Sequence, residues 1–388
     1  MSIDKTSKTP VIILTGFLGS GKSTFLNALL KNQEFKNTLV IVNEFGQIGL
    51  DHLLIEQPEE NIILLEGGCL CCEVRGDLVQ TLTDIQHRLE LKKISPFDRV
   101  IIETTGLSNP IPIMQSIICD RELMENFTMG KVITVIDGKE IIGQLEQYLE
   151  SLQQVAIADL LLISKFDIKG CFSLGEITEH LRIINPGSPI FEMDYGIVED
   201  FNLSDLLSTN KNLEVSSFLN WINLSEQLIL NRAMLNADKL DSSLRLHPIN
   251  SSGISLFSNS NKVQTFSLRK DGEITGNSFV IWLNLLATMK GENILRLKAI
   301  LNVGGKPVAL HATQTIVHVP MELKNWPSDD RSSRFVVISK GSIKKQFERS
   351  LELLDFNVQQ YDEVTLINPN SYQKFLKLAE SFSNHNSN

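Results

Sequence analysis

Residues 16–24 of the chain read Gly-Phe-Leu-Gly-Ser-Gly-Lys-Ser-Thr, which fits the pattern G-x-x-x-x-G-K-[ST] of a phosphate-binding loop. In such a loop the glycines let main-chain N–H groups curl around phosphate oxygens, the lysine adds a positive charge, and the next hydroxyl can bind Mg²⁺. The apolar run Val11–Leu14 predicts a buried strand before the loop, and the apolar positions of Phe25–Leu30 predict a helix after it. A helix N-terminus also favours anions. The residues that we predict to bind the nucleotide here are Gly16, Gly19, Ser20, Gly21, Lys22, Ser23 and Thr24.

The bulk composition limits the classes of protein to which the chain can belong. Its 388 residues allow one large domain or two ordinary ones. The net charge of −10 argues against a nucleic acid or an anionic membrane as the partner. No apolar run approaches the roughly 18 residues of a membrane helix, and the polar N-terminal residues 1–10 lack the apolar core of a signal peptide. We therefore expect a soluble, cytoplasmic protein; the sequence does not predict its oligomeric state.

Apolar runs alternate with helical patterns in the first half of the chain, for example the helical pattern of 77–91. The strand-like runs after the first are Thr38–Val42, Ile62–Leu65, Val100–Ile102, Val132–Ile136 and Leu160–Ile163. This alternation predicts an α/β fold, a P-loop NTPase with a mainly parallel sheet covered by helices on both faces. Ligands in such sheets bind at the carboxyl ends of the strands.

A different pattern in the second half predicts a smaller α+β domain. Residues 213–240 are partly helical in pattern, and the stretch 241–262 is rich in Ser and Asn. The strands expected after it are 263–270, 294–303, 307–319 and 334–339, and the expected helices are 277–289, 343–354 and 371–381. We therefore predict a nucleotide-binding domain over 1–212, a linker over 213–262 and an α+β domain over 263–388.

The strand 100–102 is followed by an acid, Glu103, and three residues later by Gly106. An acid at this place can hold Mg²⁺ together with Ser23, and the Gly106 N–H can reach the γ-phosphate. An acid at a strand end is common, so the alternative is a solvated carboxylate. Given the phosphate-binding loop, we favour a catalytic role for Lys22 and Glu103.

Ser164-Lys165-Phe166-Asp167 is similar to the guanine-reading motif Asn-Lys-x-Asp. Asp167 can accept hydrogen bonds from the N1–H and the amine of guanine, whereas adenine would present a lone pair to it. The aliphatic stem of Lys165 can lie along the base. Ser164 replaces the usual Asn, so we expect its contact with the base and the nearby loops to be shortened or lost. GTP is the expected nucleotide; a surface Lys and Asp after a strand is the alternative.

Three of the five cysteines, Cys69, Cys71 and Cys72, fall within four residues. Thiolates are soft ligands that suit Zn²⁺ and related ions, so we predict a transition-metal site there. A redox pair or a set of buried small residues is the alternative, and a tetrahedral ion would need a further ligand. Cys119 and Cys171 are isolated, and we expect both to be packing residues.

Two further acids follow the strand 38–42, in the place of a γ-phosphate-sensing loop. Glu44 lies in the run Asn43-Glu44-Phe45-Gly46, and Asp51 lies downstream. Glu44 could bind the transition metal or position water, and Asp51 is a second candidate for positioning water; a solvated loop is the alternative for both. His311 and His318 fall on one strand-like stretch, and we expect structural roles before a second metal contact.

The combination of motifs resembles the CobW family of metallochaperone GTPases. Those of the first half occur in the family's order, as 16–24, Asn-Glu-Phe-Gly at 43–46, Glu-Gly-Gly-Cys-Leu-Cys-Cys at 66–72, Glu-Thr-Thr-Gly at 103–106 and Ser-Lys-Phe-Asp at 164–167. In the second half, Phe266–Leu268, Trp282-Leu283 and Arg296–Ile300 are similar to the family's C-terminal domain, with Ala299 where a Gly is usual.

The resemblance implies a GTPase that binds a transition metal at Cys-x-Cys-Cys and delivers it to a client metalloprotein. The implied cofactors are GTP and Mg²⁺, with Zn²⁺ as the first expectation for the metal and Co²⁺ as the second. Two other classes stay open: an ATP-dependent P-loop kinase or ATPase, and a non-catalytic, metal-sensing protein that binds nucleotide and a partner.

Overall fold

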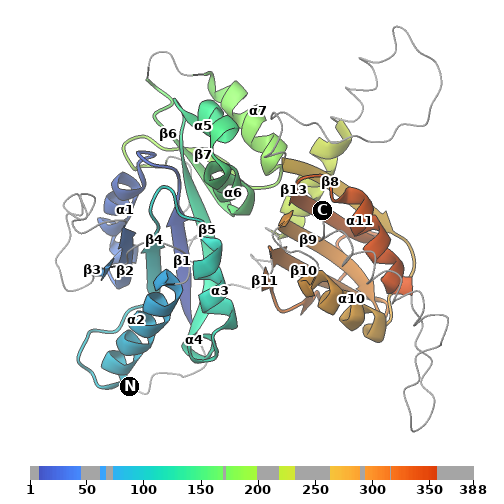
Figure 1. Cartoon of the computed structure of the whole chain (residues 1–388), viewed down its shortest axis with the longest axis horizontal. Coiled ribbons are helices and arrows are strands. Elements are labelled where there is room, and N and C mark those ends of the chain that lie inside the picture. The colour runs from blue at the N-terminus through green and yellow to red at the C-terminus, as the bar shows by residue number, and fades with distance from the viewer. Residues whose placement is uncertain are drawn as a thin grey trace. The chain divides into compact units, whose positions relative to one another are not determined.

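The chain divides into two compact units, Met1–Ser216 and Ser217–Asn388 (Figure 1). The computed structural model describes residues 8–44, 62–66, 73–168, 172–198, 218–231, 263–288, 293–314 and 316–355. For residues 43–44, 62–66, 73–77 and 287–288 it describes the main chain but not the side chains. No helix in the described part of the chain has the length and apolarity needed to cross a membrane.

Seven strands, joined mostly through helices, lie in the described part of the first unit. The strands are β1 (Thr9–Thr15), β2 (Thr38–Glu44), β3 (Ile62–Glu66), β4 (Arg99–Glu103), β5 (Phe127–Asp137), β6 (Leu160–Ser164) and β7 (Ile190–Glu192). The helices are α1 (Lys22–Leu30), η1 (Gln33–Phe35), α2 (Glu73–Glu90), α3 (Ile111–Cys119), α4 (Arg121–Asn126), α5 (Ile141–Gln147), α6 (Leu149–Ile157) and α7 (Leu174–Ile184).

The strands of the first unit form one sheet in the order β3-β2-β4-β1-β5-β6-β7, and every pairing is parallel. The predicted parallel α/β fold is therefore confirmed. β1 lies in the middle, between β4 and β5. Because all strands run the same way, the segments after β1, β4, β5 and β6 emerge at one edge of the sheet.

Both faces of this sheet are covered, as the near-continuous apolar strands predict. Ile12 and Leu14 of β1 pack with Phe25 and Leu26 of α1 in one apolar cluster. In β5, Ile133 and Val135 belong to the same cluster, so Thr134 between them points to the other face of the sheet. There its hydroxyl donates to a main-chain carbonyl of α6 at 2.9 Å. Figure 1 shows α1 on one side of the sheet and α3 on the other.

The second unit is built on an antiparallel sheet. Its strands are β8 (Val263–Lys270), β9 (Ile294–Val303), β10 (Lys306–Thr313), β11 (Ile316–Val317), β12 (Met321–Glu322) and β13 (Ser333–Lys340). They pair in the order β11-β10-β9-β13-β8, with β12 added to β10. Its helices are α10 (Gly276–Thr288), α11 (Lys344–Ser350) and η5 (Leu351–Asp355). The predicted α+β class of this half is confirmed.

The two faces of the second sheet carry different chemistry. One face, with Phe335 and the alternate residues of β9, packs with Trp282 of α10 and Phe347 of α11 in an apolar core. The opposite face meets a helix at 218–231, inside the segment that we expected to be a linker. The Arg334 guanidinium donates to Glu226 of that helix at 3.2 Å, and both side chains are buried.

Three sequence-based boundaries differ from the structure. The expected single strand 307–319 is wrong, because β10 and β11 form a hairpin whose turn includes Gln314 at φ 49°. The expected helix 343–354 becomes 3₁₀ from Leu351 onward. α2 begins at Glu73, directly after the cysteines, rather than at residue 77, where the helical pattern begins. The expected helix 371–381 lies outside the described residues.

Candidate functional site

The phosphate-binding loop connects β1 to α1, as its sequence context predicts. Gly21 precedes the helix in the left-handed region, at φ 97°, which favours a residue without a Cβ. The buried Lys22 donates its ammonium to the carbonyl oxygens of Gly16 at 3.0 Å and Phe17 at 3.2 Å. The loop therefore curls over its own lysine and fixes a positive charge beneath the main chain.

The Ser23 hydroxyl donates to Oε1 of Glu103, the last residue of β4, at 2.9 Å. Glu103 is only 2% exposed, so its carboxylate is a fixed group rather than a solvated one. The geometry thus brings together the two residues predicted to hold Mg²⁺. Hydroxyl and carboxylate oxygens are the donors that this hard cation takes in proteins, so the pair fits it.

The segment after β4 lies directly against the phosphate-binding loop. Thr104 donates its main-chain N–H to Leu14 O and its hydroxyl to Thr15 Oγ1 at 2.8 Å. A Cβ added to Gly106 would lie 2.4 Å from the Leu18 nitrogen. Gly106, the predicted γ-phosphate contact, is therefore next to the loop that would hold the phosphates.

The predicted guanine motif follows β6 and touches the same loop. Lys165 adopts the left-handed conformation at φ 55°, and its ammonium donates to Gly19 O at 2.6 Å and to Asp137 Oδ2 at 2.7 Å. The buried Ser164 donates its hydroxyl to Ser20 O at 2.6 Å. Of the contacts that we expected Ser164 to shorten or lose, the contact with the loop is therefore kept, and the contact with the base stays a prediction. Asp167 is exposed at the surface.

The last residue of the phosphate-binding set, Thr24, has an exposed side chain in the first turn of α1. Its carbonyl oxygen faces the turn after β7, because a Cβ added to Gly196 would lie 2.6 Å from it. The turn after β7 thus borders the start of α1. In the strand order β7 lies next to β6, which carries the guanine motif.

Sequence reasoning missed two residues of this site. Asp137 ends β5, is 4% exposed and pairs with Lys165. The rule that selected Glu103, an acid that ends a buried strand, would also have found Asp137. Gln154 of α6 is 1% exposed and donates to main-chain carbonyls after β4. No sequence signal marks it, because its role depends on how α6 packs.

The predicted transition-metal ligands lie largely outside the described residues. Cys69, Cys71 and Cys72 are outside them, as is Asp51. Glu44 is the last residue of β2, with its main chain but not its side chain described. Among the described residues, no group of three or more His, Cys, Asp and Glu could hold a metal ion.

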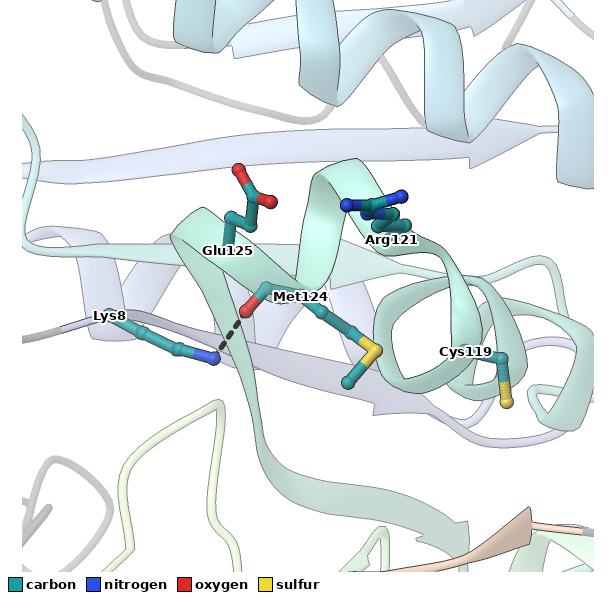
Figure 2. Close-up of a pocket in the computed structure, with 5 residues that line it drawn as sticks. All are labelled: Lys8, Cys119, Arg121, Met124 and Glu125. Atoms are coloured by element: carbon teal, nitrogen blue, oxygen red, sulfur yellow. Dashed lines mark hydrogen bonds between the residues drawn. The ribbon is translucent and has the colours of Figure 1, made fainter.

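A surface hollow at the opposite end of β1 is separate from this site. It is lined by Lys8, Cys119, Arg121, Met124 and Glu125, and Figure 2 shows the Lys8 ammonium directed at the Met124 carbonyl. Lys8 precedes β1, whereas the phosphate-binding loop follows it. Cys119 is exposed here, so the expectation that it packs in the interior is wrong. Cys171 lies outside the described residues.

In the second unit, His311 of β10 stacks on His318, with ring centroids 4.3 Å apart and planes 1° from parallel. The pKa of His311 is held well below its usual value, first by burial of the ring and then by His318, Arg296 and Lys298. Positive charges this close also oppose a metal cation, which favours the structural role over a second metal contact.

Comparison with known families separates the chain into the same two parts. Residues 10–192 match the model described as CobW/HypB/UreG, nucleotide-binding domain, and residues 263–354 match the cobalamin synthesis protein cobW C-terminal domain. The chain belongs to the CobW family. The two matches together cover well over half of its length, and all the described residues of the nucleotide site fall within the first.

Two curated relatives of this CobW-family chain carry names that refer to zinc. The zinc chaperone YjiA of Escherichia coli is 34% identical over 200 residues, which are 52% of the chain and 61% of YjiA. The zinc-regulated GTPase metalloprotein activator 1 of Schizosaccharomyces pombe is 33% identical over 220 residues, 55% of the chain and 52% of that protein. The matches thus span only about half to three-fifths of these relatives.

A solved structure, Zn(II)-bound YjiA GTPase from E. coli, aligns with a TM-score of 0.59 over 90% of the chain and 99% of that protein, at 22% identity. At this identity the likeness shows the fold alone. It agrees with a P-loop sheet followed by a separate antiparallel-sheet unit.

Proposed function

We propose that this CobW-family chain is a GTP-hydrolysing metallochaperone that binds a transition metal, Zn²⁺ first, at Cys69, Cys71 and Cys72 and transfers it to a client metalloprotein. The chain spans about half to three-fifths of the two curated relatives. One is named a zinc chaperone and the other a zinc-regulated GTPase, which supports both parts of the proposal. The observation that carries it is the strand order, because β3, which ends three residues before Cys69, lies in the same parallel sheet as β1, which ends at the phosphate-binding loop.

Guanine is the base that the motif after β6 would recognise. The Asp167 carboxylate is an acceptor for the two donors on the guanine edge, and adenine offers no such pair. Lys165 is fixed by Gly19 O and Asp137, so its aliphatic stem is placed before the base arrives. Such pre-organisation lowers the entropy lost on binding.

Residues on and beside the phosphate-binding loop would bind and orient the triphosphate. The Lys22 ammonium would exchange its carbonyl partners in part for β- and γ-phosphate oxygens. Ser23 and Glu103 would hold Mg²⁺, which, when bound, neutralises charge that develops on the phosphates. Gly106 would offer its N–H to the γ-phosphate. Glu44 and Asp51 are the candidates that would position the attacking water.

The strand before the cysteine segment lies close in the sheet to the strand that ends in Glu103, the proposed Mg²⁺ ligand. β3 precedes the cysteine segment, β4 ends in Glu103, and β2 pairs with both. The register sets Glu44 opposite Glu66, three residues before Cys69. At the usual strand spacing of about 4.8 Å, β3 lies only about 14 Å from β1. A ligand set of Glu44 and the thiolates would therefore form beside the phosphate site.

This neighbourhood gives GTP a route to control the metal. A γ-phosphate that orders the loops after β2 and β3 would assemble the ligands, and hydrolysis would release them, with the metal passing to the client. By linkage, the metal must then change GTP affinity by the same factor as GTP changes metal affinity.

Hydrolysis of GTP and of ATP, each with Mg²⁺ and with or without Zn²⁺, tests the proposal. We expect at least about a tenfold preference for GTP, the ratio that about 1.4 kcal/mol of base discrimination provides. Lys22→Ala should abolish turnover, whereas Lys31→Ala, at the exposed end of α1, should not. Equal turnover of ATP would contradict the guanine assignment, and binding without turnover of either nucleotide would contradict the hydrolase.

A further inference from the structure

The helix α6 touches both loops that would surround the γ-phosphate. Tyr148, the residue that precedes its first turn, packs on Phe17 of the phosphate-binding loop with ring centroids 4.7 Å apart. Two turns later the side chain of Gln154 reaches the segment after β4. The two contacts come from a single short helix, so α6 links the position of one loop to the position of the other.

Gln154 binds the segment after β4 through both N–H groups of its amide. Nε2 donates to Gly106 O and to Ser108 O, each at 3.1 Å, and the side chain is 1% exposed. Because both partners are carbonyl oxygens, the amide nitrogen rather than its oxygen must face them. One buried and one partly buried carbonyl are satisfied by one neutral group, which a lysine could not do without adding a charge.

The helix is itself fixed at this residue from the sheet side. The main-chain carbonyl of Gln154 accepts the buried Thr134 hydroxyl of β5 at 2.9 Å. The side chain therefore extends from a point that is anchored to the sheet next to β1. This anchor and the two hydrogen bonds, together with the hydrogen bonds of Thr104 to β1, hold Gly106 in place above the sheet.

Gly106 has little freedom on its other side. Its Cα lies so close to the phosphate-binding loop that an added Cβ would stand 2.6 Å from Leu18 Cα. The Gly106 N–H belongs to the peptide group whose oxygen, Thr105 O, accepts from the Ser108 N–H at 3.1 Å. Gln154 holds the Gly106 and Ser108 carbonyls of this same turn. Gln154 on one side and the phosphate-binding loop on the other therefore fix the turn that carries the Gly106 N–H. The direction of this N–H matters only when a γ-phosphate is present to accept from it.

We propose that Gln154 is a positioning residue that aims the Gly106 N–H at the γ-phosphate, and so lets the site distinguish a nucleoside triphosphate from a diphosphate. The proposal rests on the proposed function, because it assumes that a nucleotide triphosphate binds the loop. Gln154 touches no phosphate itself. Its effect should appear in triphosphate affinity and turnover, while contacts to the α- and β-phosphates stay intact.

Titration of the full chain with GDP and with a non-hydrolysable GTP analogue, both with Mg²⁺, tests the proposal. Gln154→Met keeps the length and removes both hydrogen bonds, and Gln154→Glu keeps the shape but turns an acceptor toward the two carbonyls. A neutral hydrogen bond contributes about fivefold to an equilibrium constant, so the Met variant should bind the analogue up to about 30-fold more weakly. GDP affinity should stay within about twofold of the wild type, which corresponds to a change under 0.5 kcal/mol.

Gln153→Met and Gln153→Glu are the matched controls, because the neighbouring glutamine lies on the same helix and is partly exposed. Both should leave the ratio of the two affinities unchanged. An equal loss for GDP and the analogue, or no loss for either, would overturn the proposal. A melting temperature for each variant identifies one that does not fold, in which case the other carries the test.

Failure of the proposed function gives a different result. If the wild type prefers ATP, guanine specificity fails, and the same comparison with ADP and an ATP analogue still tests Gln154. If the wild type binds no nucleotide, both proposals fail. If it binds GTP and the Gln154 variants keep the wild-type ratio, only the positioning role fails.

Discussion

Replacing Gly106 with alanine would add a methyl carbon where the segment after β4 touches the phosphate-binding loop. The new Cβ would stand 2.4 Å from the Leu18 nitrogen and 2.6 Å from its Cα. Protein Cβ atoms essentially never approach other heavy atoms within 3.0 Å, so the two loops must separate by at least 0.6 Å, the difference between 3.0 and 2.4 Å. The obstructing atoms are main chain, which cannot rotate away as a flexible side chain can.

Overpacking of this kind costs about 1–3 kcal/mol, which corresponds to about 5- to 150-fold in a binding constant. We expect that loss in the affinity for a non-hydrolysable GTP analogue, because the triphosphate needs both loops in contact. GDP, which would bind the phosphate-binding loop alone, should lose less.

Isothermal titration of both nucleotides against Gly106→Ala measures the effect, and Gly143→Ala is the matched control. Gly143 lies in α5, and a Cβ there would meet nothing within 4 Å. The control should bind both nucleotides as the wild type does, with a slightly more stable helix. A folded Gly106→Ala variant with wild-type affinity for the analogue would refute the placement of the two loops.

Two further changes have defined outcomes. Asp167→Asn replaces an acceptor oxygen with a donor. GTP affinity should therefore fall by roughly 10- to 100-fold, the effect of losing a charged hydrogen bond, while xanthosine triphosphate gains a partner. An unchanged preference for GTP in competition binding would contradict the base assignment. The lowered pKa of His311 keeps it neutral in the folded chain, whereas the unfolded chain takes up a proton below the usual value of 6.5. Above that pH the free energy of unfolding should therefore have its full value. At lower pH it should decrease by up to about 1.4 kcal/mol per pH unit, until the pKa of His311 in the folded chain is reached. Urea unfolding between about pH 5 and pH 8, the range in which a histidine titrates, should show a weaker dependence of the unfolding free energy on pH for His311→Gln than for the wild type. The substitution His87→Gln, at an exposed position of α2, should leave that dependence as it is in the wild type. The same dependence in all three proteins would contradict the prediction.

The local features of the fold could be predicted because they depend on local sequence. Apolar runs such as Val11–Leu14 bury both faces of a strand, and the glycines before Lys22 allow the positive φ values that a curled loop needs. These features specify a parallel sheet and its phosphate-binding edge without knowledge of distant contacts. The same reasoning placed Ser23 and Glu103 in one site, since strand ends of a parallel sheet meet at one edge.

The features that were missed depend on contacts between distant segments. The hydroxyl of Ser164 reaches Ser20, which is 144 residues away in sequence, and only the packing of β6 beside β5 shows that it can. Gln154 was missed for the same reason, since its partner Gly106 is 48 residues away in sequence. The turn at Gln314 was missed because glutamine is not a usual turn residue, and pairing of β10 with β11 overrides that preference.

Zinc titration of the protein in two nucleotide states tests the central claim most directly, namely that the nucleotide controls a thiolate site beside it. With a non-hydrolysable GTP analogue bound, Zn²⁺ should bind about 5- to 150-fold more tightly than with GDP bound, the usual range of such couplings. Replacement of Cys71 and Cys72 by serine should remove both tight binding and the difference, whereas Cys119→Ser, at an exposed position, should change neither. Equal zinc affinity in the two nucleotide states would contradict the account.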